Sequence, residues 1–287
     1  MEKVIEIKNL TKNYDSFSLK NINLGIPKGS IFGLIGENGA GKTTLIKSIL
    51  NLININDGDI KIFGKDNRGK EIYEDIGVLL DDSFLSDELT PSDLNKIMKN
   101  IYKSWDEDKY KKYIDDFKLP ESKPYKEYSS GMKMKLKLAV TLSHNPKLLI
   151  LDEPTSGLDP IARNDILDIF EDYTSDKEHT IFVSSHITSD LEHIADSIIF
   201  IDEGKIVLNT STDDLKKNYT IINCTKEELG KLDREDYIKY LKRKEEYRVL
   251  IKDKREYEKK YKTKIEDKPS IEDIMLIMIK GEEDHYE

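Results

Sequence analysis

The sequence is poor in the features that mark secreted and membrane-spanning chains. It contains 1 cysteine, Cys224, so an intramolecular disulfide is impossible and we expect a reducing compartment. Its longest apolar runs, such as KLLIL and IMLIMI, are far shorter than the ~18–20 residues that cross a bilayer. The opening MEKVIEIKNL has no apolar signal-peptide core. We therefore expect a cytoplasmic location, with any membrane role supplied by a partner.

The sequence also has fewer basic than acidic residues. The chain has 46 Lys and Arg against 56 Asp and Glu, a net charge of −10. Broad nucleic-acid binding needs a basic face, so we expect no nucleic acid among the partners. Hydrophobic residues make up 37% of the chain, enough for a core, and 287 residues suffice for one large domain or a domain with an appendage.

Short apolar segments alternate with helical patterns over residues 1–208, which is typical of an α/β domain with mostly parallel strands. Strands are predicted at 3–8, 29–36, 58–64, 75–81, 147–154, 180–186 and 197–208. Residues 82–145 turn helical instead, with Thr90 as a cap before Pro91 and Ser104 as a second cap. The sequence therefore predicts an α/β domain over 1–208 that is interrupted by a helical subdomain at about 82–145.

The composition changes over residues 209–287, which contain 19 Lys and Arg and 20 Asp and Glu. The strand-like segments YTIINC and EYRVLI each precede a helical pattern, and PSIEDIMLIMIK reads as an amphipathic helix. These patterns predict a small α+β accessory domain. Its balanced charge is typical of a solvated face, and a structural role and support of a dimer or partner both remain open.

The segment GENGAGKTT, residues 36–44, follows an apolar strand and opens a helical pattern. It matches the phosphate-loop pattern, in which glycines let backbone N–H groups approach phosphates, Lys42 supplies a positive charge and the Thr43 hydroxyl is placed for Mg²⁺. An aromatic face suits a flat base, so Tyr14 is a candidate to stack on adenine, although it is one of 15 tyrosines. The predicted nucleotide-binding residues are Tyr14, Gly36, Asn38, Gly39, Ala40, Gly41, Lys42, Thr43 and Thr44.

Two further strands end in chemically useful side chains. LLILDEP delivers Asp152 to the carboxyl edge of the sheet, where it can hold Mg²⁺, and Glu153 follows as a candidate general base for an attacking water. SSHITSD ends its strand with His186, whose imidazole is placed to contact a γ-phosphate and to hold Glu153 and water in register. Glu153 and His186, together with Lys42, are the predicted catalytic residues, and Asp152 is a predicted metal ligand.

The segment YSSGMKMKL, residues 128–136, raises a question because one phosphate loop already suffices to hold ATP. Ser129, Ser130 and Gly131 precede a helix-compatible run. Such a helix start exposes backbone N–H groups and the positive end of the helix dipole, so it can bind an anion. Taken alone, the segment is better explained as the start of an ordinary helix capped by Ser129.

The order of all these pieces resembles the ATP-binding cassette (ABC) ATPases over residues 3–208. That family implies a mostly parallel sheet with an antiparallel β subdomain, and two cassettes that close head-to-tail around two ATP molecules. The partner would be a second copy of the chain or a paralogous ABC subunit. By this resemblance Ser129, Ser130 and Gly131 are the signature that reaches the partner's γ-phosphate, and Asp159 of the SGLD segment is the cross-dimer aspartate.

The arrangement is most similar to single-cassette subunits of ABC-2-type exporters, in the bacitracin-resistance and lantibiotic-immunity group. This resemblance implies separate transmembrane permease subunits, docked at a groove around residues 81–105, and a position on the inner face of the cell membrane. It implies an amphipathic or antimicrobial peptide, for example a phenol-soluble modulin, or a lipid-like molecule as cargo.

Two departures from the family pattern concern the signature and the metal site. The usual LSGGQ is YSSGM here, so Ser130 replaces a glycine and Met132 a glutamine, a form usual in the exporter group. Asp81 stands where most ABC proteins have a glutamine, and its carboxylate is a candidate Mg²⁺ ligand that could also slow hydrolysis. A non-transporter ABC ATPase and a slow nucleotide sensor therefore remain as alternatives.

Overall fold

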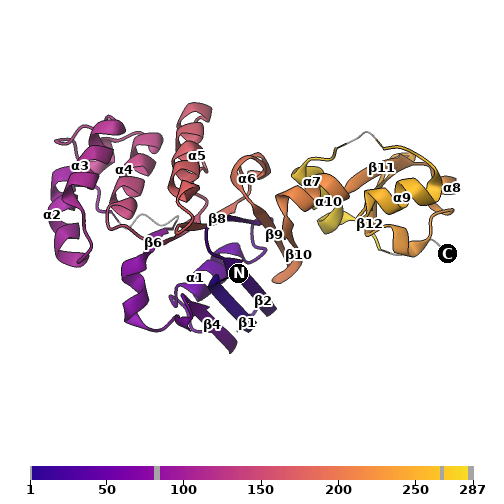
Figure 1. The fold of residues 1–287 in the computed structure, drawn as a ribbon, viewed down its shortest axis with the longest axis horizontal. Coiled ribbons are helices and arrows are strands. Elements are labelled where there is room, and N and C mark those ends of the chain that lie inside the picture. The colour runs from indigo at the N-terminus through magenta and orange to yellow at the C-terminus, as the bar shows by residue number, and fades with distance from the viewer. Residues whose placement is uncertain (1, 81–84, 266–267, 284–287) are drawn as a thin grey trace.

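The structure, a computed structural model, describes residues 2–80, 85–265 and 268–283. A six-stranded sheet forms its centre, with a helical unit at one end and residues 212–283 at the other (Figure 1). The strands of this sheet, in spatial order, are β10 (Lys205–Ser211), β9 (Ser197–Asp202), β3 (Ile31–Ile35), β8 (Thr180–Ser185), β7 (Leu148–Asp152) and β6 (Ile76–Leu79). Every neighbouring pair is parallel except β10 with β9. This confirms the predicted α/β fold with a mostly parallel sheet.

The central strands are buried on both faces. All five residues of β7 and all five of β3 are buried, which is why both read as continuous apolar runs rather than alternating ones. The apolar run at 197–208 forms two strands instead of one, because Glu203 and Gly204 turn with positive φ angles of 43° and 74°.

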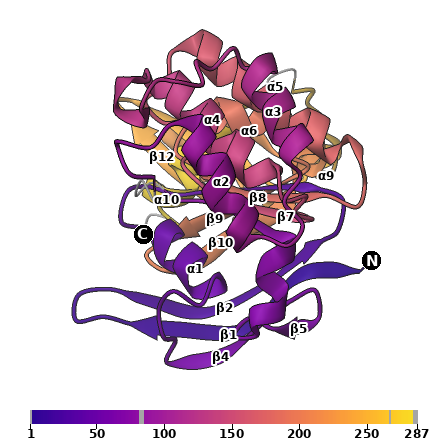
Figure 2. The ribbon, with the colours of Figure 1, turned by 90° about the vertical axis from the view of Figure 1, so that its left-hand side faces the viewer.

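A smaller antiparallel sheet lies under the central one (Figure 2). Its order is β2 (Ser18–Pro27), β1 (Lys3–Asn13), β4 (Asp57–Ile62) and β5 (Lys65–Asp66). Helix α1 (Lys42–Ile49) is packed between the two sheets, and its Leu45, Ile46 and Ile49 join one core cluster with both. The helix that follows the phosphate loop is therefore held by packing on both sides.

The helical unit follows β6 and a 3-10 turn, η1 (Lys70–Asp75). It consists of α2 (Pro91–Ile101), α3 (Glu107–Asp116), η2 (Tyr125–Glu127) and α4 (Ser130–Leu142). The predicted Thr90 cap is confirmed, with a capping box to Asp93. The predicted Ser104 cap is wrong: Asp106 caps α3, and the Ser104 hydroxyl instead donates to Glu74 at 2.8 Å.

Helices α5 (Pro160–Ser175) and α6 (Thr188–Ile194) share the core of the other face of the large sheet. After β10 the chain forms a three-stranded antiparallel sheet in the order β11 (Thr220–Cys224), β13 (Glu246–Ile251) and β12 (Lys239–Arg243). The accompanying helices are α7 (Thr212–Asn218), α8 (Lys226–Leu229), η3 (Arg234–Asp236), α9 (Lys254–Tyr261) and α10 (Ile271–Lys280). In the described ranges, every helix is too short or too polar to span a membrane.

Candidate functional site: a phosphate loop facing an acidic strand end

The phosphate loop, residues 36–41, joins β3 to α1. Gly41 has a φ of 115°, a backbone conformation that favours glycine, and a Cβ there would lie 2.7 Å from Cζ of Phe17. Gly41 also caps α1 without a side chain, and no acidic residue occupies the first turn. The first N–H groups of α1 are thus left for an anion at the positive end of the helix.

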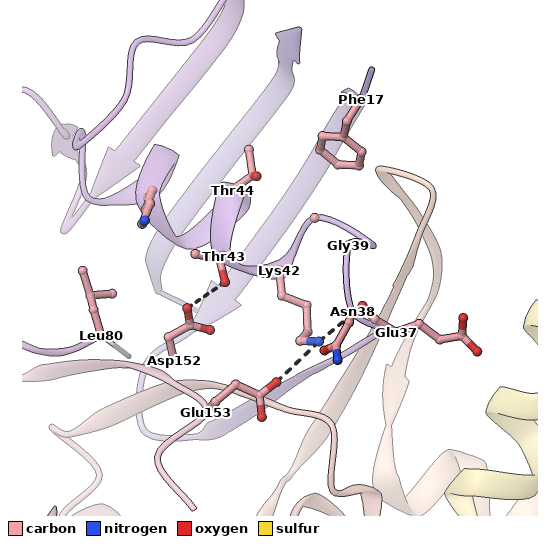
Figure 3. Close-up of a pocket in the computed structure, with 12 residues that line it drawn as sticks. Phe17, Glu37, Asn38, Gly39, Lys42, Thr43, Thr44, Leu80, Asp152 and Glu153 are labelled. Atoms are coloured by element: carbon pink, nitrogen blue, oxygen red, sulfur yellow. Dashed lines mark hydrogen bonds and ion pairs between the residues drawn. The ribbon is translucent and has the colours of Figure 1, made fainter. Parts of the chain in front are cut away.

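The loop and the ends of the strands beside it enclose a cavity of about 600 Å³ (Figure 3). It is lined by Phe17, Glu37, Asn38, Gly39, Gly41, Lys42, Thr43, Thr44, Lys47, Leu80, Asp152 and Glu153. Most of the residues assigned to the nucleotide therefore come together around one space. Gly36 and Ala40 belong to the same loop.

Lys42 is buried, with 6% of its surface exposed. Its Nζ donates to the Gly36 carbonyl at 2.7 Å and lies 3.4 Å from Oε1 of Glu153. The ammonium is therefore held by its own loop and by the acidic strand end across the cavity, where a phosphate would meet it.

Asp152 lies opposite Thr43. The Thr43 hydroxyl donates to Oδ2 of Asp152 at 2.8 Å, and the Ser184 hydroxyl donates to Oδ1 at 2.5 Å. A hydroxyl and a carboxylate are oxygen donors of the kind that Mg²⁺ prefers, so this pair fits the ion. Within the described ranges no cluster of three His, Cys, Asp or Glu side chains could hold a metal. Thr43 and Asp152 would thus hold the ion together with substrate phosphates and water.

Glu153 and His186 face each other across neighbouring strand ends. Nδ1 of His186 lies 2.5 Å from Oε2 of Glu153, and the His186 backbone N–H donates to the same oxygen at 3.1 Å. Glu153 has a φ of 52°, uncommon for a residue other than glycine, and its N–H donates to the Ser184 hydroxyl at 3.1 Å. Strained backbone of this kind gathers at functional sites.

The predicted adenine-stacking residue, Tyr14, lies in the turn between β1 and β2. Its side chain is half exposed, and Nζ of Lys12 lies 4.8 Å from the ring centroid. Phe17, from the same turn, lines the cavity and approaches Gly41. Phe17 is therefore a second candidate for the stacking role, and the aromatic at 14 stays a prediction.

The signature segment does not line this cavity. Ser129 caps α4 by accepting a hydrogen bond from the Met132 N–H at 3.3 Å, and Ser129 and Ser130 are exposed. A Cβ on Gly131 would lie 2.9 Å from Cβ of Ala162 on α5, so glycine lets the start of α4 approach that helix. The structure places the segment on the helical unit, apart from α1 (Figure 1).

Of the two remaining predicted site residues, the structure describes Asp159 but not Asp81. Asp159 is exposed and caps α5 by accepting hydrogen bonds from the Ile161 and Ala162 N–H groups, both at 3.0 Å. Asp81 lies outside the described residues. Leu80, which precedes it, lines the cavity.

A buried charge network behind the site was not expected from the sequence. Asp190 on α6 accepts a hydrogen bond from the Thr155 hydroxyl at 2.7 Å and pairs with the Arg163 guanidinium on α5. Arg163 also donates to the Ser189 hydroxyl at 2.7 Å. The network joins the segment after Glu153 to both helices. Asp190 ends the SSHITSD segment, but its spacing gives no sign of its partners.

Comparison with known proteins places these features in a family. The sequence model of the ABC transporter family matches residues 19–156. The bacitracin transport ATP-binding protein BcrA of Enterococcus faecalis is 37% identical over 222 residues, 76% of this chain and 72% of that protein. The lantibiotic transport ATP-binding protein SrtF of Streptococcus pyogenes is 38% identical over 213 residues, 73% of this chain and 92% of that protein.

Solved structures agree on the fold. An ATP-binding subunit of an ABC transporter superimposes with a TM-score of 0.67 at 26% identity, over 74% of this chain and 92% of the other. CbiO1 of Clostridium perfringens gives a TM-score of 0.65 at 24% identity, over 75% of this chain and 91% of the other. The resemblance to transport ATPases of the bacitracin and lantibiotic group is confirmed, and the chain belongs to the ABC transporter ATPase family.

Proposed function

We propose that the chain hydrolyses ATP in the cavity beside its phosphate loop and so drives an exporter built with separate transmembrane subunits. The observation that carries the proposal is the pairing of Lys42 with Glu153 and of Thr43 with Asp152 in one cavity, together with the contact of Glu153 with His186. These pairings put a cation, a metal-binding oxygen pair and a carboxylate with its imidazole partner at one sheet edge. These are the groups that an enzyme uses for phosphoryl transfer to water.

In this reaction a water oxygen bonds to the γ-phosphorus, and the bond from that phosphorus to the bridging oxygen breaks, which gives ADP and phosphate. Glu153 orients the water and accepts its proton. The Glu153 carboxylate accepts hydrogen bonds, so Nδ1 of His186 is the donor in the contact between them. This hydrogen bond holds the imidazole at the edge of the sheet. Lys42 neutralises phosphate charge. Bound Mg²⁺, held by Thr43 and Asp152, would supply further neutralisation.

A head-to-tail dimer would complete the site. The start of α4 is exposed, with N–H groups and hydroxyls at the positive end of a helix, and it lies away from its own phosphate loop. In a dimer, Ser129, Ser130 and Gly131 would meet the nucleotide of the partner, and Asp159 would lie at the interface. The partner would be a second copy or a paralogous subunit.

An apolar groove supports docking of the transmembrane subunits. A cavity of about 340 Å³ lies between α1, the end of β6 and the helices α2 and α4. Its lining is mostly apolar or aromatic and includes Leu52, Tyr73, Val78, Leu80, Met98, Tyr102 and Val140. Leu52 is 57% exposed, and Ile101 at the end of α2 is 60% exposed. Exposed apolar surface of this kind suits a segment of a membrane protein and supports a position of the chain on the inner face of the membrane.

The cargo is inferred from relatives alone. The matched proteins are named for transport of bacitracin and lantibiotics, which are antimicrobial peptides. We extend this class to an amphipathic peptide, for example a phenol-soluble modulin, or a lipid-like molecule. The transmembrane partner would select it.

Phosphate release by the Glu153→Gln variant tests the hydrolysis proposal. The variant should bind ATP, accumulate as an ATP-bound dimer and release phosphate at about a hundredth of the wild-type rate or less, because the amide cannot accept the proton. Wild-type turnover in this variant would remove Glu153 as the base.

Purification from membranes tests the partner: an integral membrane protein should co-purify, whereas a chain that stays wholly in the soluble fraction favours a non-transporter ATPase.

A further inference from the structure

Helix α10 joins residues 212–283 to the core of the nucleotide-binding region. Its apolar face is buried at Ile271, Ile274, Ile277 and Met278. These side chains belong to the same core cluster as the face of α6 and the strands β8 and β9. The helix is therefore part of the main core.

The contact with α6 bears on the site because of where α6 begins. Its first residue, Thr188, follows His186 by two positions, and its buried residues Leu191 and Ile194 lie in the shared cluster. The helix has 7 residues, too few for a helix that is stable by itself. Its position therefore depends on what packs against it, and α10 is one of those elements.

A second link runs from the end of α10 to the phosphate loop. Nζ of Lys280 lies 3.7 Å from Oε1 of Glu37, and Glu37 lines the nucleotide cavity. Both side chains are more than half exposed, so the pair adds little stability. The ion pair matters for its position, because it holds the positive charge of Lys280 beside the phosphate loop.

On its other side, α10 is fixed to the three-stranded sheet. Arg248 of β13 donates to Asp273 at 2.7 Å, and Nζ of Lys239 on β12 donates to the Met278 carbonyl at 2.9 Å. The backbone of Glu282 pairs with Tyr240 of β12. Any displacement of this sheet would therefore carry α10 with it.

We propose that residues 212–283 act as a positioning unit for ATP hydrolysis, with α10 supporting α6 behind His186 and holding Lys280 beside the phosphate loop. The proposal rests on the roles proposed above for His186 and the loop. Disturbing the apolar face of α10 should lower kcat, because His186 directly precedes α6 and depends on its position. Reversing the charge of Lys280 should raise KM for ATP, because the loop binds the phosphates.

Two matched alanine variants test the support of α6. Ile277 and Ile251 are both 0% exposed, but Ile277 packs in the core cluster that contains α6, whereas Ile251 packs in the cluster confined to residues 224–257. Ile277→Ala should lower kcat about tenfold with KM unchanged, and Ile277→Val should restore most of it. Ile251→Ala should keep wild-type kcat. Both are assayed as the full chain with Mg-ATP, below the temperature at which either unfolds.

Equal kcat in Ile277→Ala and the wild type, or an equal loss in both alanine variants, would overturn the support of α6.

For the loop, Lys280→Glu should raise KM about threefold and Lys280→Arg should not. Lys231→Glu makes the same charge change at an ion pair with Glu227, within the same unit, and should leave KM unchanged. An equal rise in both Glu variants would overturn the second link. Glu153→Gln separates these outcomes from a failure of the proposed site, because it removes the proposed base directly and leaves the packing of α10 unchanged.

Discussion

Nδ1 of His186 and Oε2 of Glu153 lie 2.5 Å apart, joining the ends of two neighbouring parallel strands. The His186 N–H donates to the same carboxylate oxygen, so the carboxylate accepts from both backbone and ring. The two residues are far apart in sequence, and the sheet alone brings them together. Their pairing makes the orientation of the proposed base depend on the imidazole.

Replacing His186 by alanine should lower kcat about a hundredfold and leave nucleotide affinity nearly unchanged. The variant removes the ring that holds Glu153 but leaves Lys42 and the phosphate loop intact. Steady-state phosphate release and binding of a fluorescent ATP analogue measure the two effects. His193→Ala is the control, because His193 is exposed on α6, the helix that follows His186, and its Nδ1 lies 3.8 Å from Oε1 of Glu171, outside the site. Equal turnover in the two variants would contradict the role of His186.

Replacing Asp190 by alanine should reduce the free energy of unfolding by about 3 kcal/mol, because it leaves the Arg163 guanidinium without its buried partner. Urea denaturation at pH 7 measures the change. Asp213→Ala breaks an exposed pair with Lys217 and should leave the midpoint unchanged. A variant at 190 as stable as the wild type would show that the network does not stabilise the fold.

Replacing Gly131 by alanine should destabilise the isolated subunit by about 1–3 kcal/mol, because the new methyl group meets Ala162 at 2.9 Å. The double variant with Ala162→Gly should recover most of the lost stability, since it removes the opposing methyl group. Thermal unfolding of the single and double variants measures this. Additive losses in the double variant would rule out the steric explanation.

Stability should fall as the pH drops below neutrality because of His144. This residue is 1% exposed, its Nε2 lies 3.1 Å from the Ile76 carbonyl, and burial lowers its pKa from the ordinary value. Glu74 opposes this shift and Lys109 adds to it. Below a pH of about 6.5 the unfolded chain therefore binds a proton that the folded chain does not.

Urea denaturation of the wild type and of His144→Gln at pH 7.5 and 5.5 isolates this contribution. The wild type should lose more unfolding free energy between the two pH values than the variant does. Parallel pH profiles for the two proteins would show that His144 does not titrate on unfolding.

Much of the site follows from local patterns. Asp152 and His186 could be assigned because each lies at the carboxyl end of a recognisable strand, and such ends share one edge of a parallel sheet. Lys42 and Thr43 could be assigned because they begin the helix after the phosphate loop that follows another such strand. Phe17 could not be separated from Tyr14, because the choice depends on how one turn folds over Gly41.

Other features depend on contacts between distant segments. The apolar pattern of residues 271–280 predicts a helix but does not say which surface it covers. The two partners of Asp190, Thr155 and Arg163, belong to two other segments, and no spacing in the sequence predicts them. Strand β2 also went unpredicted, and its position follows from its pairing with β1.

The packing of α10 on α6 also has a consequence for the order of events on the ribosome. Residues 271–280 are synthesised ~80 residues after α6, and at about 5–20 residues per second this interval lasts roughly 4–16 s. During that time the apolar face of α6 lacks one of its covering elements. A nascent chain therefore completes its phosphate loop well before it completes the support behind His186, and a ribosome that stalls within this window leaves a chain with a finished loop and an unsupported imidazole.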